Sequence, residues 1–543
     1  KSCEKLDLVS LPSTLKTIGD EAFRDCISLK NITFPTGVSI KRCAFKSSGL
    51  TAVTIPSGVE LVGAVFEDCQ ALQQVTLQPG MQSSGTGNFF KCTGLKSLSI
   101  PAGVDLGENM FSNCLALEQV TFQPGLTAIS AGCFYRCAAL KDVVLPAGVI
   151  IKTNAFVSSG LTSINIPADA VLGKGAFSYC AALQQVTLQP GSGGQIVSED
   201  CFYGCNALTN ITLPAGLSIQ EEAFAKTGLT SISIPADTAL SRAVFKDCLS
   251  LVQVTLQPGL QSISKDCFKG CMALKGVDLS AGIEIQENAF SYTGLMALII
   301  PADTVLGYAA FSYCPYLQQV TLLPGLKALS KNCFMGAKSL DIITIPGSVK
   351  DIPSGAFAGC GLTQVNLEDG VTSIQSNSFP GCVYLHMIRI PRSVTYIAPG
   401  GTEDGSGPFA MSKMTVIYGY LNSAAHLAAY KYSIHFIDLE SGEQNPLPTI
   451  TITSTQDNTI SYLGSITLES SQEGVIWSSD NAYVQLVPNG NKVTVYSLKN
   501  FTKTGTVTIT ATLGDITENY EIKIKPNFLQ WLQIIFLFGW IWM

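Results

Sequence analysis

The amino-acid sequence predicts a solenoid of stacked repeats, in which every repeat supplies one turn with a short strand, followed by an all-β sandwich. Three observations support this fold class. A phenylalanine recurs every 21 to 25 residues from Phe23 to Phe379, and Phe409 follows after 30. Alternating apolar and polar residues follow each of these phenylalanines, as in a half-buried strand. Beyond residue 448 the period is lost, and short alternating segments are separated by turn residues instead.

Each repeat has two parts, which LTAISAGCFYRCAALKDVVLPAG illustrates. Phe134, Cys137 and Leu140 are apolar positions of the turn. Val143 and Leu145 then alternate with their neighbours at the strand period of two, until a proline ends the run. One such turn cannot cover its own apolar side, but stacked neighbours cover one another and form a continuous core.

The cysteines follow the repeat as well. Of the 18, 12 lie three residues after a marker phenylalanine and five lie one or two residues before one. In other repeats the position three residues after the phenylalanine is occupied by Ser48, Ser159, Thr227, Thr293 and Ala337. We therefore interpret the cysteines as small buried side chains. A disulfide between stacked turns, for example Cys248 with Cys271, is the alternative. The CFxxC spacing and the absence of nearby histidines argue against a metal site.

The repeats end in a segment that is suited to close the array. In residues 414–439, Asn422 or Ser423 can cap a short Ala-rich helix, and SIHFIDL is typical of a last strand. Residues 441–448, SGEQNPLP, have the composition of a linker. The sequence therefore predicts a repeat domain over residues 1–440, with its C-terminal cap at 414–439.

Residues 449–525 contain short alternating strands of the kind found in a β-sandwich, and Trp477 is expected in its core. The last segment, residues 526–543, is apolar and aromatic. As a helix it would have about the shortest length that can span a bilayer. We expect it to associate the chain with a membrane or cell wall, and packing on its own domain is the alternative.

The repeat LxxIxxxAFxxCxxLxxVxLPxxV resembles the leucine-rich repeats of BspA-like surface proteins, and residues 15–38 match it almost letter for letter. The resemblance covers roughly residues 1–440. It implies a leucine-rich-repeat solenoid whose short strands form a parallel sheet on one face. Residues 449–525 resemble the bacterial group 2 immunoglobulin-like domain. The first resemblance implies a bacterial protein, extracellular or at the cell surface, with a role in adhesion. The second implies a domain that spaces or presents a surface protein, although fold alone does not give function.

Enzymatic chemistry is not expected. The three histidines, His386, His426 and His435, all follow residue 385, and no HExxH, GxSxG or phosphate loop occurs. Glu403 and Asp404 could offer oxygen ligands to Ca²⁺ but lack the spacing of a calcium loop, so a solvated loop is the preferred interpretation. We predict no catalytic residue, no cofactor and no metal. With 13% charged residues, a net charge of -7 and no basic block, nucleic acid is not an expected partner.

The predicted sheet face is uniform except in one region. Across seventeen strands, the 34 outward positions hold three charged residues and no aromatic one. A sugar-stacking groove needs exposed rings, so carbohydrate recognition is not expected on this face. Between residues 276 and 390, apolar residues replace polar ones and tyrosines crowd the turns behind the sheet. The candidate partner-binding residues are Tyr292, Ala297, Ile299, Tyr308, Tyr313, Tyr316, Ile342, Met387 and Arg389.

Three functions remain open. The first is a binding protein or adhesin whose solenoid contacts a protein or extracellular-matrix ligand. The second is a structural stalk or cell-envelope element without a specific ligand, which the near-identical repeats favour. The third is the non-catalytic part of a larger surface enzyme, since residue 1 lies inside a repeat and no signal peptide precedes it.

Overall fold

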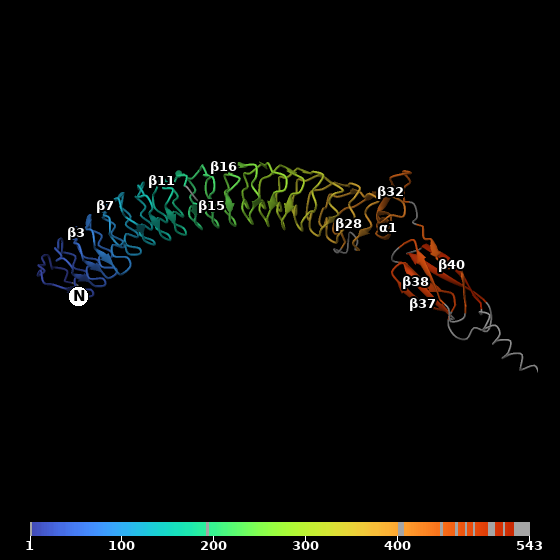
Figure 1. Ribbon diagram of the computed structural model, residues 1–543, viewed down its shortest axis with the longest axis horizontal. Coiled ribbons are helices and arrows are strands. Elements are labelled where there is room, and N and C mark those ends of the chain that lie inside the picture. The colour runs from blue at the N-terminus through green and yellow to red at the C-terminus, as the bar shows by residue number, and fades with distance from the viewer. Residues whose placement is uncertain are drawn as a thin grey trace, which may run out of the picture. The chain divides into compact units, whose positions relative to one another are not determined.

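The computed structural model describes residues 3–191, 195–399, 407–445, 449–461, 465–472, 475–481, 484–497, 505–513 and 516–525 (Figure 1). The predicted solvated loop with Glu403 and Asp404 and the predicted tail over 526–543 lie outside the described residues. The chain divides into two compact units, which are described separately. The first comprises Lys1–Leu385 with Ala398–Lys413, and the second comprises the described residues of His386–Ile397 and Met414–Met543.

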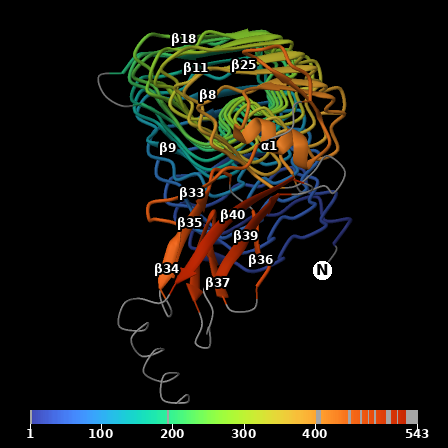
Figure 2. The same cartoon turned by 90° about the vertical axis from the view of Figure 1, so that its right-hand side faces the viewer.

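The first unit is a solenoid in which neighbouring repeats pair in parallel, as predicted (Figures 1 and 2). One series of parallel sheets, together called the long-strand sheet, consists mostly of four-residue strands. These are β3 (Ala52–Ile55), β5 (Gln74–Leu77), β7 (Ser97–Ile100), β8 (Gln119–Phe122), β11 (Ser163–Ile166), β13 (Gln185–Leu188), β16 (Ser231–Ile234), β18 (Gln253–Leu256), β20 (Gly276–Val277), β22 (Ala297–Ile300), β24 (Gln319–Leu322), β25 (Ile342–Ile345) and β27 (Gln364–Leu367).

A second, narrower set of parallel strands precedes the phenylalanines. Each strand has two residues, so most repeats have two strands where one was predicted. These strands are β1 (Thr17–Ile18), β2 (Ser39–Ile40), β4 (Glu60–Leu61), β6 (Gln82–Ser83), β9 (Ala128–Ile129), β10 (Ile150–Ile151), β12 (Val171–Leu172), β14 (Ile196–Val197), β15 (Ser218–Ile219), β17 (Ala239–Leu240), β19 (Ser262–Ile263), β21 (Glu284–Ile285), β23 (Val305–Leu306), β26 (Asp351–Ile352) and β28 (Ser373–Ile374).

Side-chain alternation sets which side of the long-strand sheet is buried. In β8 the side chains of Val120 and Phe122 are buried, and those of Gln119 and Thr121 are exposed. The same pattern recurs in β5, β13 and β24. Prolines help to end the strands: Pro56 follows β3 directly and, lacking an N–H, cannot extend the pairing.

The marker phenylalanines form one continuous stack through the first unit. Successive rings from Phe23 to Phe409 lie with centroids 5.0 to 5.9 Å apart and planes within 6 to 15° of parallel. Phe23 is half-buried, and from Phe45 onward the rings are buried. Each repeat of the sequence thus adds one ring to the stack.

The second unit begins with β29 (Met387–Arg389), β30 (Tyr396–Ile397), β31 (Val416–Gly419), α1 (Ala424–Lys431) and β32 (His435–Asp438). Strands β29, β31 and β32 pair in parallel. Of the two residues considered as caps of α1, Ser423 accepts a hydrogen bond from the His426 N–H. His426 is buried against Phe436, with ring centroids 4.4 Å apart, so its place is structural.

The remaining strands of the second unit form two four-stranded sheets around an apolar core, which confirms the all-β prediction. Their orders are β33 (Ile452–Ser454), β35 (Ser465–Ser470), β38 (Lys492–Ser497), β37 (Val484–Asn489), and β34 (Thr459–Ser461), β40 (Ile516–Lys525), β39 (Gly505–Leu513), β36 (Ile476–Ser479). Trp477 lies in the core, as predicted. The immunoglobulin-like identity of these sheets and the domain bounds at 440 and 449 stay predictions.

Candidate binding surfaces

The segment around each marker phenylalanine, from three residues before it to two after it, is called the phenylalanine turn here. Its backbone binds the next repeat directly. The Phe290 N–H donates to the Ala310 carbonyl at 2.9 Å, and the Tyr292 N–H donates to the Ser312 carbonyl at 2.9 Å. Tyr292 and Tyr313 adopt left-handed φ angles of 58° and 55°. Because the backbone is fixed in this way, side chains at one position project side by side from successive repeats.

Three of the four predicted tyrosines, Tyr292, Tyr308 and Tyr313, lie on phenylalanine turns. The rings of Tyr292 and Tyr313, which we call the tyrosine pair, stack with centroids 4.7 Å apart and planes 16° from parallel. They are 45% and 40% exposed. The Tyr308 hydroxyl accepts a hydrogen bond from Asn332 Nδ2 at 2.7 Å. Tyr316 is exposed in the same repeat as Tyr313.

A glycine in the next repeat leaves room for the ring of Tyr313. Gly336 occupies the position of Tyr313 in the next repeat and has a φ of 76°. A Cβ at Gly336 would lie 2.8 Å from Cδ1 of Tyr313. The Tyr313 ring therefore lies over Gly336, where a larger side chain would displace it.

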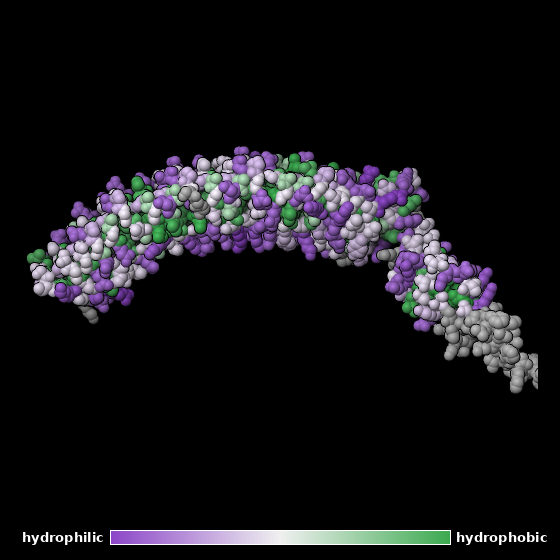
Figure 3. Space-filling model, in the orientation of Figure 1, coloured by the Kyte–Doolittle hydropathy of each residue, from purple (hydrophilic) through white to green (hydrophobic). Residues whose placement is uncertain are grey.

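The predicted apolar residues on the sheet face do not meet in one patch. Ala297 and Ile299 are both exposed on β22, and Ile342 is exposed on β25. Strand β24 lies between them and presents Gln319 and Thr321. Figure 3 likewise shows hydrophobic residues in separate patches on the visible face of the first unit.

Met387 and Arg389 lie on β29, in the second unit. Met387 is half-buried and Arg389 is exposed. The nine predicted residues therefore divide among the tyrosine turns, the sheet face of the first unit and β29. Their role in binding stays a prediction.

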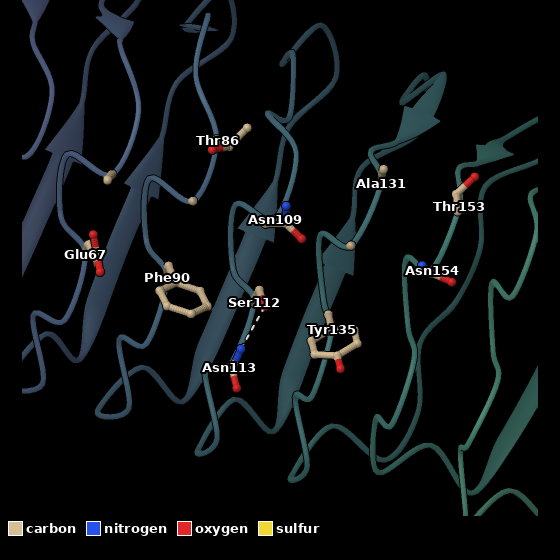
Figure 4. A pocket seen from close by; sticks show the side chains of 13 residues that line it. Glu67, Thr86, Phe90, Asn109, Ser112, Asn113, Ala131, Tyr135, Thr153 and Asn154 are labelled. Carbon is tan, nitrogen blue, oxygen red and sulfur yellow. Dashed lines mark hydrogen bonds between the residues drawn. The ribbon is translucent and has the colours of Figure 1, made fainter.

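The structure also has a groove that we did not predict. It runs over the phenylalanine turns and consists of two hollows of about 630 and 430 Å³, which share Tyr135 and Asn154 in their linings. Phe90 lines the first hollow, and Tyr179 and Tyr203 line the second. We call this the aromatic groove. Figure 4 shows the rings of Phe90 and Tyr135 on either side of Ser112 and Asn113.

The buried cysteines lie beneath the phenylalanine turns. Of the 18 cysteines, all unpaired, 17 are buried, as their interpretation as packing residues requires. Cys248 Sγ donates to the Phe224 carbonyl at 3.2 Å, and Thr227 Oγ1 lies 3.2 Å from the same sulfur. Burial raises the pKa of the Cys248 thiol to about 11. Cys271 makes the equivalent hydrogen bond to Phe245, so the two thiols have separate partners.

Neither a metal centre nor a spanning helix is found in the described part of the chain. No group of three or more His, Cys, Asp or Glu side chains there is arranged to hold a metal ion. No described helix has both the length and the apolar composition needed to cross a membrane.

Comparisons with known proteins agree with this architecture. The chain matches the family described as BspA type Leucine rich repeat region in six copies, over residues 1–114, 64–184, 104–215, 195–318 and 304–401. Among curated proteins no relative matches it.

Several solved structures are similar in fold. A leucine-rich repeat protein from Bacteroides ovatus is 23% identical, with a TM-score of 0.45, over 64% of this chain and 92% of that one. A leucine rich cell surface protein from Faecalibacterium prausnitzii is 24% identical, with a TM-score of 0.29, over 72% and 85%. The pneumococcal vaccine antigen PcpA is 17% identical, with a TM-score of 0.31, over 79% and 85%.

Proposed function

The chain belongs to the BspA-type leucine-rich-repeat family, and from this premise we propose that it is an extracellular or cell-surface adhesin whose solenoid binds a protein of the host or its extracellular matrix. Within the solenoid we assign the contact to residues 276–390. The tyrosine pair is its centre, and the sheet face around Ile299 and Ile342 is secondary.

The observation that carries this proposal is the exposure of two stacked rings on a fixed backbone. Binding hot spots are enriched in aromatic anchors, because one ring contributes a large apolar area together with a polar handle. Tyr292 and Tyr313 already support each other at 4.7 Å. Their side chains therefore lose little conformational freedom when a partner covers them, and that lowers the entropic cost of binding.

A structural stalk without a ligand is the second candidate, and the sheet face favours it. There, polar side chains bind the neighbouring strand: Gln189 Nε2 donates to Asn165 Oδ1 at 3.0 Å, and Gln257 Nε2 donates to Ser233 Oγ at 3.1 Å. Side chains used in this way stabilise the sheet, so a uniform face needs no partner.

Binding of the full chain to a panel of immobilised extracellular-matrix proteins tests the proposal. Once a partner is identified, its affinity is measured for Tyr292→Ala/Tyr313→Ala and, separately, for Ile299→Thr/Ile342→Thr. We expect a loss of at least about tenfold for the tyrosine variant and a smaller one for the isoleucine variant. Tyr396→Ala removes an exposed ring outside residues 276–390 and serves as the control.

If both double variants keep full affinity while their circular dichroism and melting stay unchanged, the binding location is wrong. If the panel and surface-displayed pull-down yield no partner at all, the stalk is the better account.

A further inference from the structure

The aromatic groove has two rings at equivalent positions in its first hollow. Phe90 and Tyr135 both directly follow a marker phenylalanine, Phe89 and Phe134, and lie two repeats apart. Strands paired side by side lie about 4.8 Å apart, so the two rings lie on the order of 10 Å apart along the solenoid. In the second hollow the ring centroids of Tyr179 and Tyr203 lie 5.3 Å from each other.

Cations hold three of these rings in place. Lys91 Nζ lies 5.2 Å from the centroid of the Phe90 ring, and Arg136 Cζ lies 5.4 Å from that of Tyr135. Lys226 Nζ lies 5.2 Å from the centroid of Tyr203. Such contacts orient a ring, so that less freedom is lost when a ligand stacks on it.

Between the rings the groove offers side chains that both donate and accept hydrogen bonds. Asn109 and Asn154 are exposed, and each amide carries two N–H donors and a carbonyl acceptor. Asn113 donates to Ser112 Oγ at 2.9 Å through Nδ2, which leaves its carbonyl oxygen as an acceptor. A ligand rich in hydroxyl groups, each a donor and an acceptor at once, fits this lining.

The carboxylates of the lining are already paired with cations. Glu67 forms an ion pair with Lys46 at 2.8 Å, and Glu222 forms one with Lys246 at 3.1 Å. Asp200 lies 3.5 Å from the ammonium group of Lys174. Because each of these carboxylates has a cation, the lining gives a cationic ligand little to bind.

We propose that the aromatic groove binds an extended, β-linked glycan. Two pyranose rings joined in an extended chain span about the distance between Phe90 and Tyr135, so alternate sugars would stack on successive rings while their hydroxyl groups bond to the asparagines between. The site lies on the phenylalanine turns of the first half of the solenoid. It is therefore separate from the tyrosine pair and does not depend on the proposed protein contact.

A peptide fits this spacing less well. Side chains on one face of an extended strand repeat about every 7 Å, which does not match rings on the order of 10 Å apart. A polyproline helix repeats about every 9 Å and does match. Its backbone, however, offers carbonyl acceptors almost alone, and the acceptors of Asn109, Asn113 and Asn154 would then have no donors to bind.

Titration calorimetry of the full chain with four probes tests the proposal: cellohexaose, chitohexaose, the curved α-linked maltohexaose and a proline-rich decapeptide. We expect one or both β-linked hexasaccharides to bind and the other two probes to bind at least about tenfold more weakly. Phe90→Ala/Tyr135→Ala should weaken hexasaccharide binding by about tenfold or more, and Tyr179→Ala/Tyr203→Ala by less.

Two further variants separate stacking from folding and from general apolar contact. Phe90→Leu/Tyr135→Leu keeps apolar volume but removes the flat rings, and it should lose binding nearly as much as the alanine variant. Tyr384→Ala, outside the groove, should bind like the parent. The proposal is overturned if neither β-linked hexasaccharide binds, if removing the rings leaves affinity unchanged in a folded chain, or if the decapeptide binds more tightly than the sugars.

Discussion

The long-strand sheet and the phenylalanine turns are two faces of the same repeats, and backbone hydrogen bonds join neighbouring repeats on both. On the sheet face, side chains such as Gln189 and Gln257 add hydrogen bonds to the preceding strand. On the turn face, Tyr292 and Tyr313 add a ring contact instead. The two faces therefore differ in what their side chains contribute beyond the shared backbone pairing.

The composition of the two faces follows this difference. The sheet face repeats Gln and Thr from strand to strand, in β5, β8, β13, β18 and β24. On the turns, the residue directly after the marker phenylalanine is Glu67, Phe90, Ser112, Tyr135 and Val157 in five successive repeats. Both proposed binding sites lie where the side chains vary, and three predictions test whether stability and binding separate in this way.

The largest effect is expected from the core beneath the turns. Phe224 is fully buried between Phe202 and Phe245, with ring centroids at 5.3 and 5.8 Å. Phe224→Ala should lower the free energy of unfolding by about 3–5 kcal/mol, because it removes apolar contacts and leaves a cavity between two rings. Guanidinium denaturation measures it. Ala225→Ser, at the next buried position, is the control for substitution itself, and a loss below about 1 kcal/mol for Phe224→Ala would contradict the stack as the main stabilising element.

A smaller effect is expected from the thiols under the turns. Burial raises the pKa of Cys248 from 9.0 to about 11. The folded chain thus holds this proton more tightly than the unfolded chain does. Its contribution to stability is complete below pH 9.0 and is lost as the pH rises through about 11. For a shift of this size the contribution is about 2–3 kcal/mol.

Denaturation between about pH 8 and pH 10.5 measures this dependence. Cys248→Ala should lose less stability over that interval than the parent chain, because its unfolded state has one thiol fewer to ionise. Cys3→Ala removes an exposed thiol and controls for the reactivity of cysteine at alkaline pH. Equal slopes for the parent and Cys248→Ala would show that the thiol is solvated in the folded chain.

The features of the fold that recur in every repeat could be predicted from the sequence. Phe134, Cys137 and Val143 are buried as expected, because one position has one environment throughout a solenoid. The two-residue strands, such as Ala128–Ile129, were missed, since two residues are too short to show a period. They form because the preceding repeat already presents a matching backbone.

The aromatic groove was missed for a different reason. Phe90 and Tyr135 are 45 residues apart in the sequence and stand in otherwise unlike segments. They become neighbours along the solenoid only when repeats are aligned on the marker phenylalanine and the residue directly after it is compared. The tyrosine pair was found because its two members lie in adjacent repeats with similar sequences.

The smallest effect is expected from the side-chain hydrogen bonds of the sheet face, and it is the most direct test of the comparison. Gln189→Ala/Gln257→Ala removes two exposed hydrogen bonds between strands, to Asn165 and to Ser233. Exposed hydrogen bonds exchange readily with water, so the expected loss is at the low end of their usual range, about 1 kcal/mol for the pair. Ligand binding at the tyrosine pair and at the aromatic groove should not change, because the backbone of the turns does not depend on these side chains.

Tyr292→Ala/Tyr313→Ala should show the opposite pattern. Partner binding should fall by about tenfold, and stability should fall by no more than the loss of one ring contact, about 0.5–1.5 kcal/mol. Denaturation and affinity measured on both variants decide the matter: if the glutamine variant loses binding as strongly as the tyrosine variant does, the two faces are coupled and the division of stability and binding between them is wrong.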